Sequence, residues 1–68
     1  MFLHFANMIK ELREEKGLTQ RQLAEIIGLT SNAVYEWEKR GKQPNFETLC
    51  KLADFFNVSI DYLLGREL

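Results

Sequence analysis

Residues 19–39 read TQRQLAEIIGLTSNAVYEWEK, and this segment predicts two short helices joined by a tight turn. Thr19 is a suitable N-cap for the first helix, which Gly28 ends, and Thr30 can cap the second helix only two positions later. The inward-facing apolar positions are Leu23, Ala24 and Ile27 in the first helix and Val34 and Trp37 in the second. Two short helices joined so closely must cross steeply.

Apolar residues at three- and four-residue spacing predict further helices on both sides of this segment. Upstream, we expect a helix from near Phe5 to Lys16, ended by Gly17. Downstream, a loop over residues 39–44 leads to a helix capped by Asn45. The inner face of that helix is expected to carry Phe46, Leu49, Leu52, Ala53 and Phe56.

A short last helix completes the predicted set. Asn57 terminates the preceding helix, Ser59 caps a helix from Ile60 to Leu64, and Gly65 closes it. No segment alternates apolar and polar residues as a strand does. The sequence therefore predicts an all-α, compact five-helix bundle that forms one domain over residues 1–68, with its core at about 8–65.

Chain length and cysteine content limit how this domain is stabilised. The 68 residues, 46% of them hydrophobic, suffice for one core but not for two domains or for a core that encloses a cofactor. The single cysteine, Cys50, excludes an internal disulfide, so helix packing must carry the stability. Cys50 is interpreted as a packed or half-packed thiol, with a redox switch as the alternative.

Residues for catalysis, metal binding or membrane insertion are scarce. His4 and Cys50 are the only residues of their kinds, which leaves too few ligands for zinc and no nucleophile with its base. No apolar run approaches the roughly 20 residues of a membrane span, and the opening MFLHF lacks a basic leader and a cleavage site. We expect a cytoplasmic protein that is not an enzyme, has no cofactor and has no membrane association.

The charge balance gives two opposing indications about nucleic acid. A net charge of −1 and a pI near 5.8 differ from the basic balance typical of DNA-binding domains. Lys39, Arg40 and Lys42, however, form a local basic cluster in a segment without acidic residues. This cluster has two interpretations, a phosphate-binding patch or a solvated helix end whose cations offset the helix dipole.

The helix carrying Val34 and Trp37 has a polar opposite face. At about 100° per residue, Asn32, Tyr35, Glu36 and Lys39 point away from the core. Together with Ser31, such side chains can reach base edges: Asn pairs with adenine, Tyr packs on a thymine methyl, and Glu accepts from cytosine N4. The alternative is an ordinary solvated helix face.

The chain resembles the Cro and phage-repressor helix-turn-helix family, often called the Xre family, over about residues 8–65. The resemblance rests on Ile9-Lys10-Glu11-Leu12-Arg13, Gly17-Leu18-Thr19-Gln20, Gln22-Leu23-Ala24-Glu25, Trp37-Glu38, Pro44 and Leu52-Ala53 at the right spacing. It implies a lambda-repressor-like bundle in which the second and third helices form the helix-turn-helix. It also implies a bacterial or phage transcriptional regulator, acting as a repressor and associated with the nucleoid, whose third helix reads an operator in double-stranded DNA.

The resemblance also assigns roles to individual residues. The third helix would contact bases through Ser31, Asn32, Tyr35 and Glu36. Phosphate contacts would come from Gln20, Arg21, Lys39, Arg40, Lys42 and Asn45. Arg13 and Glu38 look similar to a charged pair that the family buries between its first and third helices.

One departure from the family pattern affects the end of the third helix. The family usually has Asn-Gly after Trp37-Glu38, whereas this chain has Lys39-Arg40-Gly41. We expect the third helix to run about one residue longer, which leaves the placement of Arg40 open.

Surplus apolar residues predict self-association. The core of a bundle this small does not obviously need Phe2, Leu3, Phe5, Phe55 and Tyr62. A two-fold dimer would place its recognition helices about 34 to 36 Å apart, matching successive major grooves. The resemblance points to residues 59–65 as the dimer interface; folding of Phe2 and Phe5 over the core is the alternative.

The main alternative function is a protein-interaction module of the same fold, such as an antitoxin-like partner, and the acidic pI favours it. Nothing in the sequence predicts a pocket for a small-molecule effector.

Overall fold

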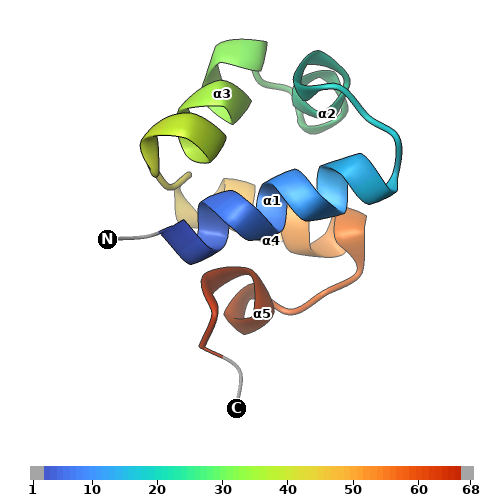
Figure 1. The fold of residues 1–68 in the computed structure, drawn as a ribbon. Helices are drawn as coiled ribbons and strands as arrows, with labels where there is room; N and C mark the ends of the chain where they lie inside the picture. The colour runs from blue at the N-terminus through green and yellow to red at the C-terminus, as the bar shows by residue number, and fades with distance from the viewer. Residues whose placement is uncertain (1–2, 67–68) are drawn as a thin grey trace.

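The computed structural model of the protein describes residues 3–66, which form five α-helices and no strand (Figure 1). The helices are α1 (Leu3–Glu15), α2 (Gln20–Ile27), α3 (Ser31–Arg40), α4 (Phe46–Phe56) and α5 (Ile60–Leu64). The predicted all-α, five-helix architecture is therefore confirmed. None of the helices in this part of the chain is long and apolar enough to cross a membrane.

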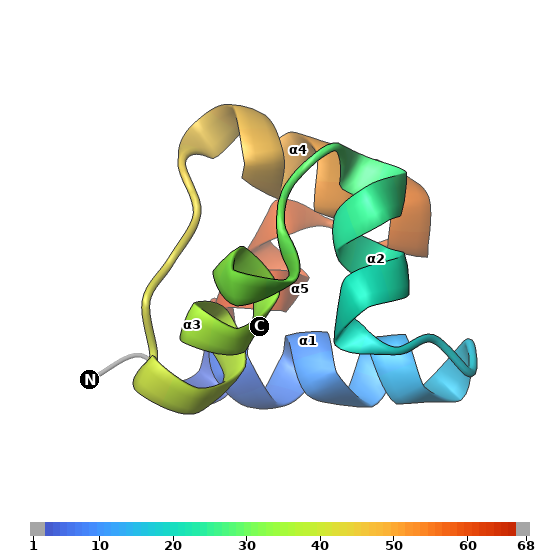
Figure 2. The same ribbon diagram turned by 90° about the horizontal axis from the view of Figure 1, so that it is seen from above.

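The helices surround one hydrophobic core. In Figure 1, α2 and α3 lie on one side of α1 and α5 lies on the other; seen from above, α1 and α4 lie on opposite sides of the bundle (Figure 2). The largest fully buried side chains come from all five helices and are Phe5, Ile9, Leu23, Val34, Leu52 and Leu63. The Phe5 ring packs edge-on against Trp37, with ring centroids 6.1 Å apart, which fixes α3 against α1.

Local capping explains where most helices begin. Thr19 and Gln22 form a reciprocal capping box, in which the Gln22 N–H donates to Thr19 Oγ1 at 3.0 Å and the Thr19 N–H donates to Gln22 Oε1 at 2.8 Å. Asn45 and Ser59 accept from backbone N–H groups three residues on, at the starts of α4 and α5. Thr30 lies at the N-cap of α3 as predicted, but its side chain makes no capping hydrogen bond.

Predicted and observed helix boundaries differ at both ends of α1 and at the end of α3. Helix α1 ends at Glu15, one residue before the predicted Lys16. Helix α1 begins at Leu3, ahead of the expected start near Phe5, because Phe5 and Ala6 are already part of its buried face. Helix α3 continues through Arg40, so the predicted loop from Lys39 begins only at Gly41, in agreement with the expected lengthening of this helix. Gly41 ends α3 with φ = 70°, a left-handed conformation that glycine adopts without a Cβ clash.

The prediction that Phe46 lies on the inner face of α4 is wrong. Phe46 is 71% exposed, whereas Leu49, Leu52, Ala53 and Phe56 on the same helix are buried as predicted. Phe46 opens α4, and its ring lies outside the core that the later turns cover. The spacing of apolar residues along a helix predicts the direction in which a side chain points. It does not predict how far along the helix axis the core extends.

The predicted surplus of apolar residues is only partly observed. Phe5 is 1% exposed and belongs to the core, and Phe55 is half-buried against it with Lys16 placed over its ring. Tyr62 on α5 remains 41% exposed. Phe2, and the side chain of Leu3, lie outside the residues that the structure describes.

Candidate nucleic-acid interface

Helix α3 presents one polar face to solvent and buries the other. Val34 and Trp37 are 0% and 4% exposed, so they anchor the helix on the core. Ser31 and Asn32 are exposed on its first turn, and Tyr35 is 42% exposed one turn later. The structure therefore places Ser31, Asn32 and Tyr35 on one accessible surface, with a buried stripe behind it that fixes its orientation.

The first turn of α3 has no side-chain cap, although the Ala33 N–H donates to the Thr30 carbonyl at 3.0 Å. The first N–H groups of an α-helix have no carbonyl partner within the helix, and a side-chain cap usually takes one of them. At α3 the Thr30 hydroxyl does not do so, although Thr19, Asn45 and Ser59 cap their helices. The exposed Ser31 and Asn32 side chains lie beside these N–H groups, at the positive end of the helix dipole.

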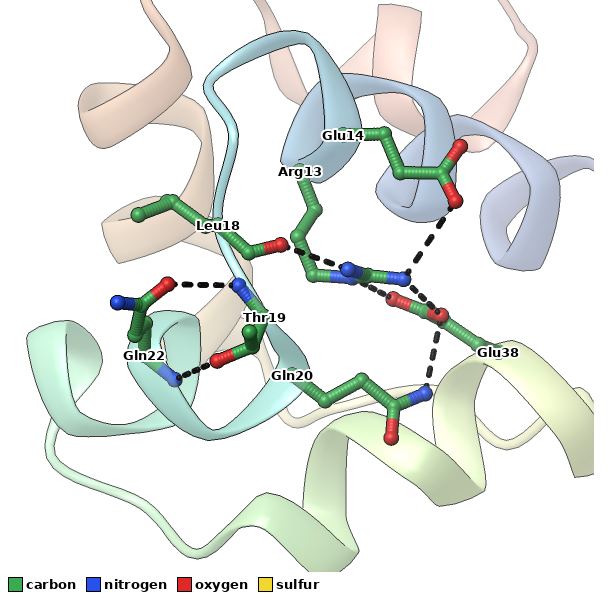
Figure 3. Close-up of polar contacts among 7 residues, drawn as sticks. All are labelled: Arg13, Glu14, Leu18, Thr19, Gln20, Gln22 and Glu38. Carbon is green, nitrogen blue, oxygen red and sulfur yellow. Dashed lines mark hydrogen bonds and ion pairs between the residues drawn. The ribbon is translucent and has the colours of Figure 1, made fainter.

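Arg13, on α1, connects this helix to α3 and to the loop that precedes α2 (Figure 3). Its guanidinium donates to Glu38 Oε2 at 2.7 Å through Nε, to Glu38 Oε1 at 3.0 Å through Nη2, and to the Leu18 carbonyl at 2.7 Å through Nη1. The hydrogen bond with Glu38 raises the pKa of Arg13 above its ordinary value, against the opposing effect of burial. The structure thus contains the charged pair that the sequence resemblance indicated, between α1 and α3.

Gln20 contributes to the same network, a contact that the sequence did not predict. Its side-chain nitrogen donates to Glu38 Oε1 at 3.1 Å, which connects the start of α2 to the end of α3 (Figure 3). Gln20 and Glu38 lie 18 positions apart, and no local pattern in the sequence signals their contact. A phosphate contact by Gln20 would therefore come from a side chain already held in place by Glu38.

The predicted basic cluster is partly neutralised by Glu36. The Arg40 guanidinium lies 3.5 Å from Glu36 Oε2, and the Lys42 ammonium lies 3.4 Å from Glu36 Oε1. The cationic side chains are 67% and 70% exposed, whereas the Glu36 side chain is 21% exposed. The carboxylate that was predicted to face bases is thus directed to two of the predicted phosphate-binding cations, while Lys39 is exposed.

The remaining predicted phosphate contacts lie on different elements. Arg21 is 82% exposed on α2, with its Nε 3.6 Å from Glu25 Oε2. Asn45 uses its side-chain oxygen to accept from the Thr48 N–H at 2.9 Å, so this oxygen caps α4. The structure brings Arg40 and Lys42 together around Glu36 and does not show Arg21 or Asn45 in contact with them.

Other features of the described residues lie apart from these side chains. An open groove of about 490 Å³ lies between the end of α2 and α4, and no residue predicted to contact DNA lines it; the lining residues are Glu25, Ile26, Ile27, Gly28, Lys51, Asp54 and Phe55. Over residues 3–66 there is no group of three or more side chains suited to hold a metal ion. Cys50 is a half-buried free thiol on α4.

Comparison with known families and proteins gives a consistent result. A family model described as "Helix-turn-helix" matches residues 9–63. The HTH-type transcriptional regulator ImmR of Bacillus subtilis (strain 168) is 39% identical over 59 residues, which cover 87% of this chain and 46% of ImmR. The HTH-type transcriptional activator BcrR of Enterococcus faecalis is 40% identical over 65 residues, which cover 96% of this chain and 32% of BcrR. The chain spans less than half the length of either relative.

The fold is also similar to that of a solved protein–DNA complex. The crystal structure of the P22 c2 repressor with a synthetic operator, in the presence of Tl⁺, matches with a TM-score of 0.84 and 28% sequence identity. The match covers 93% of this chain and 96% of that one.

Proposed function

This chain belongs to the helix-turn-helix family, and from that premise we propose that it is a transcriptional regulator that binds a specific sequence in double-stranded DNA. The observation that carries the proposal is the accessible face of α3, where Ser31, Asn32 and Tyr35 stand over the buried Val34 and Trp37. The similarity to the operator-bound P22 c2 repressor supports the same use of the fold.

Helix α3 would enter the major groove with its first two turns against the base edges. Asn32 is suited to pair with an adenine, Tyr35 to pack on a thymine methyl group, and Ser31 to reach a base or a phosphate. The network of Arg13, Glu38 and Gln20 would hold α3 at a fixed angle to α1 and α2 while the domain is bound.

The sequence-independent part of the affinity would come from contacts to phosphates around this helix. The residues proposed for these contacts are Gln20, Arg21, Lys39, Arg40, Lys42 and Asn45. Gln20 and Asn45 open α2 and α4, where backbone N–H groups also favour an anion. Affinity is then expected to fall steeply as salt rises.

A homodimer on an inverted repeat is the finer form of this proposal. Recognition helices on successive major grooves must lie about one turn of DNA apart, roughly 34 to 36 Å. The extents of the described residues, 31 × 24 × 22 Å, allow one copy to occupy each half-site. Tyr62, exposed on α5, is a candidate for the contact between copies. In a bacterial or phage context such a dimer would act in the cytoplasm, where the DNA lies.

Repression is the proposed direction of regulation. The P22 c2 protein is a repressor and BcrR is an activator, so membership of the family supports regulation without fixing its sign. A dimer on an operator that overlaps a promoter would exclude polymerase without further contacts.

The test is selection of duplexes from a random-sequence DNA pool by the intact chain, compared with Asn32→Ala and Tyr35→Ala variants. Enrichment of two inverted half-sites about one helical turn apart is expected, with a loss of about 1 to 3 kcal/mol of discrimination at one base pair in Asn32→Ala. Asn7→Ala, an equivalent change at an exposed position of α1, is the matched control and should select the same sites.

Absence of any enriched sequence at low salt would overturn the proposal and favour a protein-interaction module. The net charge of −1 is one observation that favours a protein-interaction module. The exposure of Phe46, Ile26 and Leu29, at 71%, 49% and 40%, is another, because exposed apolar side chains suit a protein partner.

A further inference from the structure

Glu36 occupies an unusual place for an acidic residue on a DNA-facing helix. It lies one turn before Arg40 on α3, which puts the two side chains on the same face of the helix. Its own main-chain carbonyl accepts from the N–H groups of both Gly41 and Lys42, so the left-handed turn at Gly41 folds the chain back over Glu36. The turn of the backbone therefore brings Lys42 close to the Glu36 carboxylate.

The two oxygens of this carboxylate serve different cations. Oε2 faces the Arg40 guanidinium at 3.5 Å and Oε1 faces the Lys42 ammonium at 3.4 Å. Glu38, two positions further along, is already held by Arg13 and has 1% of its side chain exposed, so it does not act on this cluster. Glu36 is thus the carboxylate that the structure places against Arg40 and Lys42.

We infer that Glu36 is an internal counter-ion that competes with DNA phosphates for Arg40 and Lys42, and so limits the sequence-independent affinity of the domain. This inference rests on the proposed DNA-binding function. A phosphate that binds either cation must first displace the Glu36 carboxylate from its ion pair. The carboxylate is then left unpaired near the DNA backbone, and its negative charge repels the phosphates. Lys39 is exposed and forms no ion pair among the described residues, so it would be free to bind a phosphate without displacing a carboxylate.

This role differs from the base contact that the sequence suggested for Glu36. A carboxylate that reads cytosine N4 strengthens binding to one sequence, so its loss weakens operator binding. A counter-ion acts on every duplex, so its loss strengthens binding to all sequences and makes it more sensitive to salt. The two roles therefore predict changes of opposite sign.

The experiment measures the dissociation constant of the intact chain for a random-sequence duplex of about 20 base pairs, over a range of salt concentrations. Glu36→Gln, which keeps the size of the side chain, is expected to tighten binding about threefold to tenfold, the range of two exposed ion pairs. The plot of log affinity against log salt should steepen by about 0.9, the value of one additional phosphate neutralised. A thermal melt confirms that the variant is folded.

Two controls separate the cluster from a general effect of net charge. Asp54→Asn removes the same charge from an exposed site in the last turn of α4, which lies across the molecule from the end of α3 (Figures 1 and 2). It should change random-duplex binding much less than Glu36→Gln. In a background carrying Arg40→Gln and Lys42→Gln, the effect of Glu36→Gln should shrink to that of Asp54→Asn.

The outcomes also distinguish this inference from the proposed function. If Glu36→Gln binds random duplex no better than Asp54→Asn, or weakens binding to the selected operator only, the counter-ion role is overturned and DNA binding stands. If the unmodified chain binds no duplex even at low salt, the proposed function fails and this inference fails with it. Heparin is a polyanion without a base sequence, and Glu36→Gln should elute from a heparin column at a higher salt concentration than Asp54→Asn. Elution of the two variants at the same salt concentration counts against the inference.

Discussion

Arg13 and Glu38 lie 25 positions apart in the chain and are joined by two charge-assisted hydrogen bonds of 2.7 and 3.0 Å. Their side chains are 11% and 1% exposed, so the pair is largely withdrawn from water. It connects the first helix to the far end of the third, and Gln20 adds a bond from the second. The orientation of α3 therefore depends on a polar contact as well as on the apolar stripe beneath it.

Replacing Arg13 by methionine should lower the free energy of unfolding by about 3 to 5 kcal/mol, because the substitution leaves the Glu38 carboxylate buried without its partner. The hydrogen bond with Glu38 raises the pKa of Arg13, so the guanidinium is charged at neutral pH, where the loss is measured. Urea denaturation measures it. Lys10→Met, at an exposed site on the same helix, is the control, and an equal stability of the two variants would contradict a structural role for the pair.

The two threonine caps of the helix-turn-helix should differ in strength. Thr19→Ala removes one half of a capping box and is expected to cost about 1 kcal/mol of stability. Thr30→Ala removes a side chain that makes no capping hydrogen bond, so it should cost only a few tenths of a kcal/mol. Chemical denaturation of the two variants side by side decides the matter; equal losses would show that Thr30 caps α3 in solution.

The two phenylalanines at the ends of α4 should respond differently to truncation. Phe46→Ala removes a ring that is 71% exposed and should leave stability within about 0.5 kcal/mol of the parent. Phe56→Ala empties a site that is 7% exposed and should cost about 3 to 5 kcal/mol. Thermal melting of both variants is the measurement. A large loss for Phe46→Ala would restore the sequence-based prediction that this ring belongs to the core.

Gly65 and Gly17 have similar backbone angles but different surroundings. Both have φ near +70°, at 74° and 69°, so alanine is strained at either position by about 1 to 2 kcal/mol. A Cβ at Gly65 would lie 2.6 Å from the His4 ring, whereas one at Gly17 meets nothing within 4 Å. Gly65→Ala should therefore be the more destabilising variant in urea denaturation. When His4→Ala is added to Gly65→Ala, the loss of stability should fall to that of Gly17→Ala. A loss of stability that stays unchanged would show that the His4 ring is not the obstacle.

The sequence was sufficient for the helices and for most of the core. Thr19, Gly28, Asn45 and Ser59 act on backbone groups within a few residues, so the boundaries they set can be inferred without knowledge of the fold. The apolar spacing likewise placed Val34 and Trp37 opposite the face that carries Asn32 and Tyr35. The resemblance to the repressor family supplied the Arg13–Glu38 pair, which no local rule indicates.

Contacts between elements depended on the tertiary structure. Helical periodicity gives the direction of Phe46 but not the length of α4 that the core covers, and that length is set by how the neighbouring helices pack. The bond from Gln20 to Glu38 requires the crossing of α2 and α3, and the grouping of Arg40 and Lys42 around Glu36 requires the turn at Gly41. Short-range hydrogen bonding and periodicity thus determined which segments are helical and which face of α3 is polar. Only the folded chain decided which charges there are paired, because the Arg13–Glu38–Gln20 network needs three segments packed together and the contact of Lys42 with Glu36 needs the chain to turn back at Gly41.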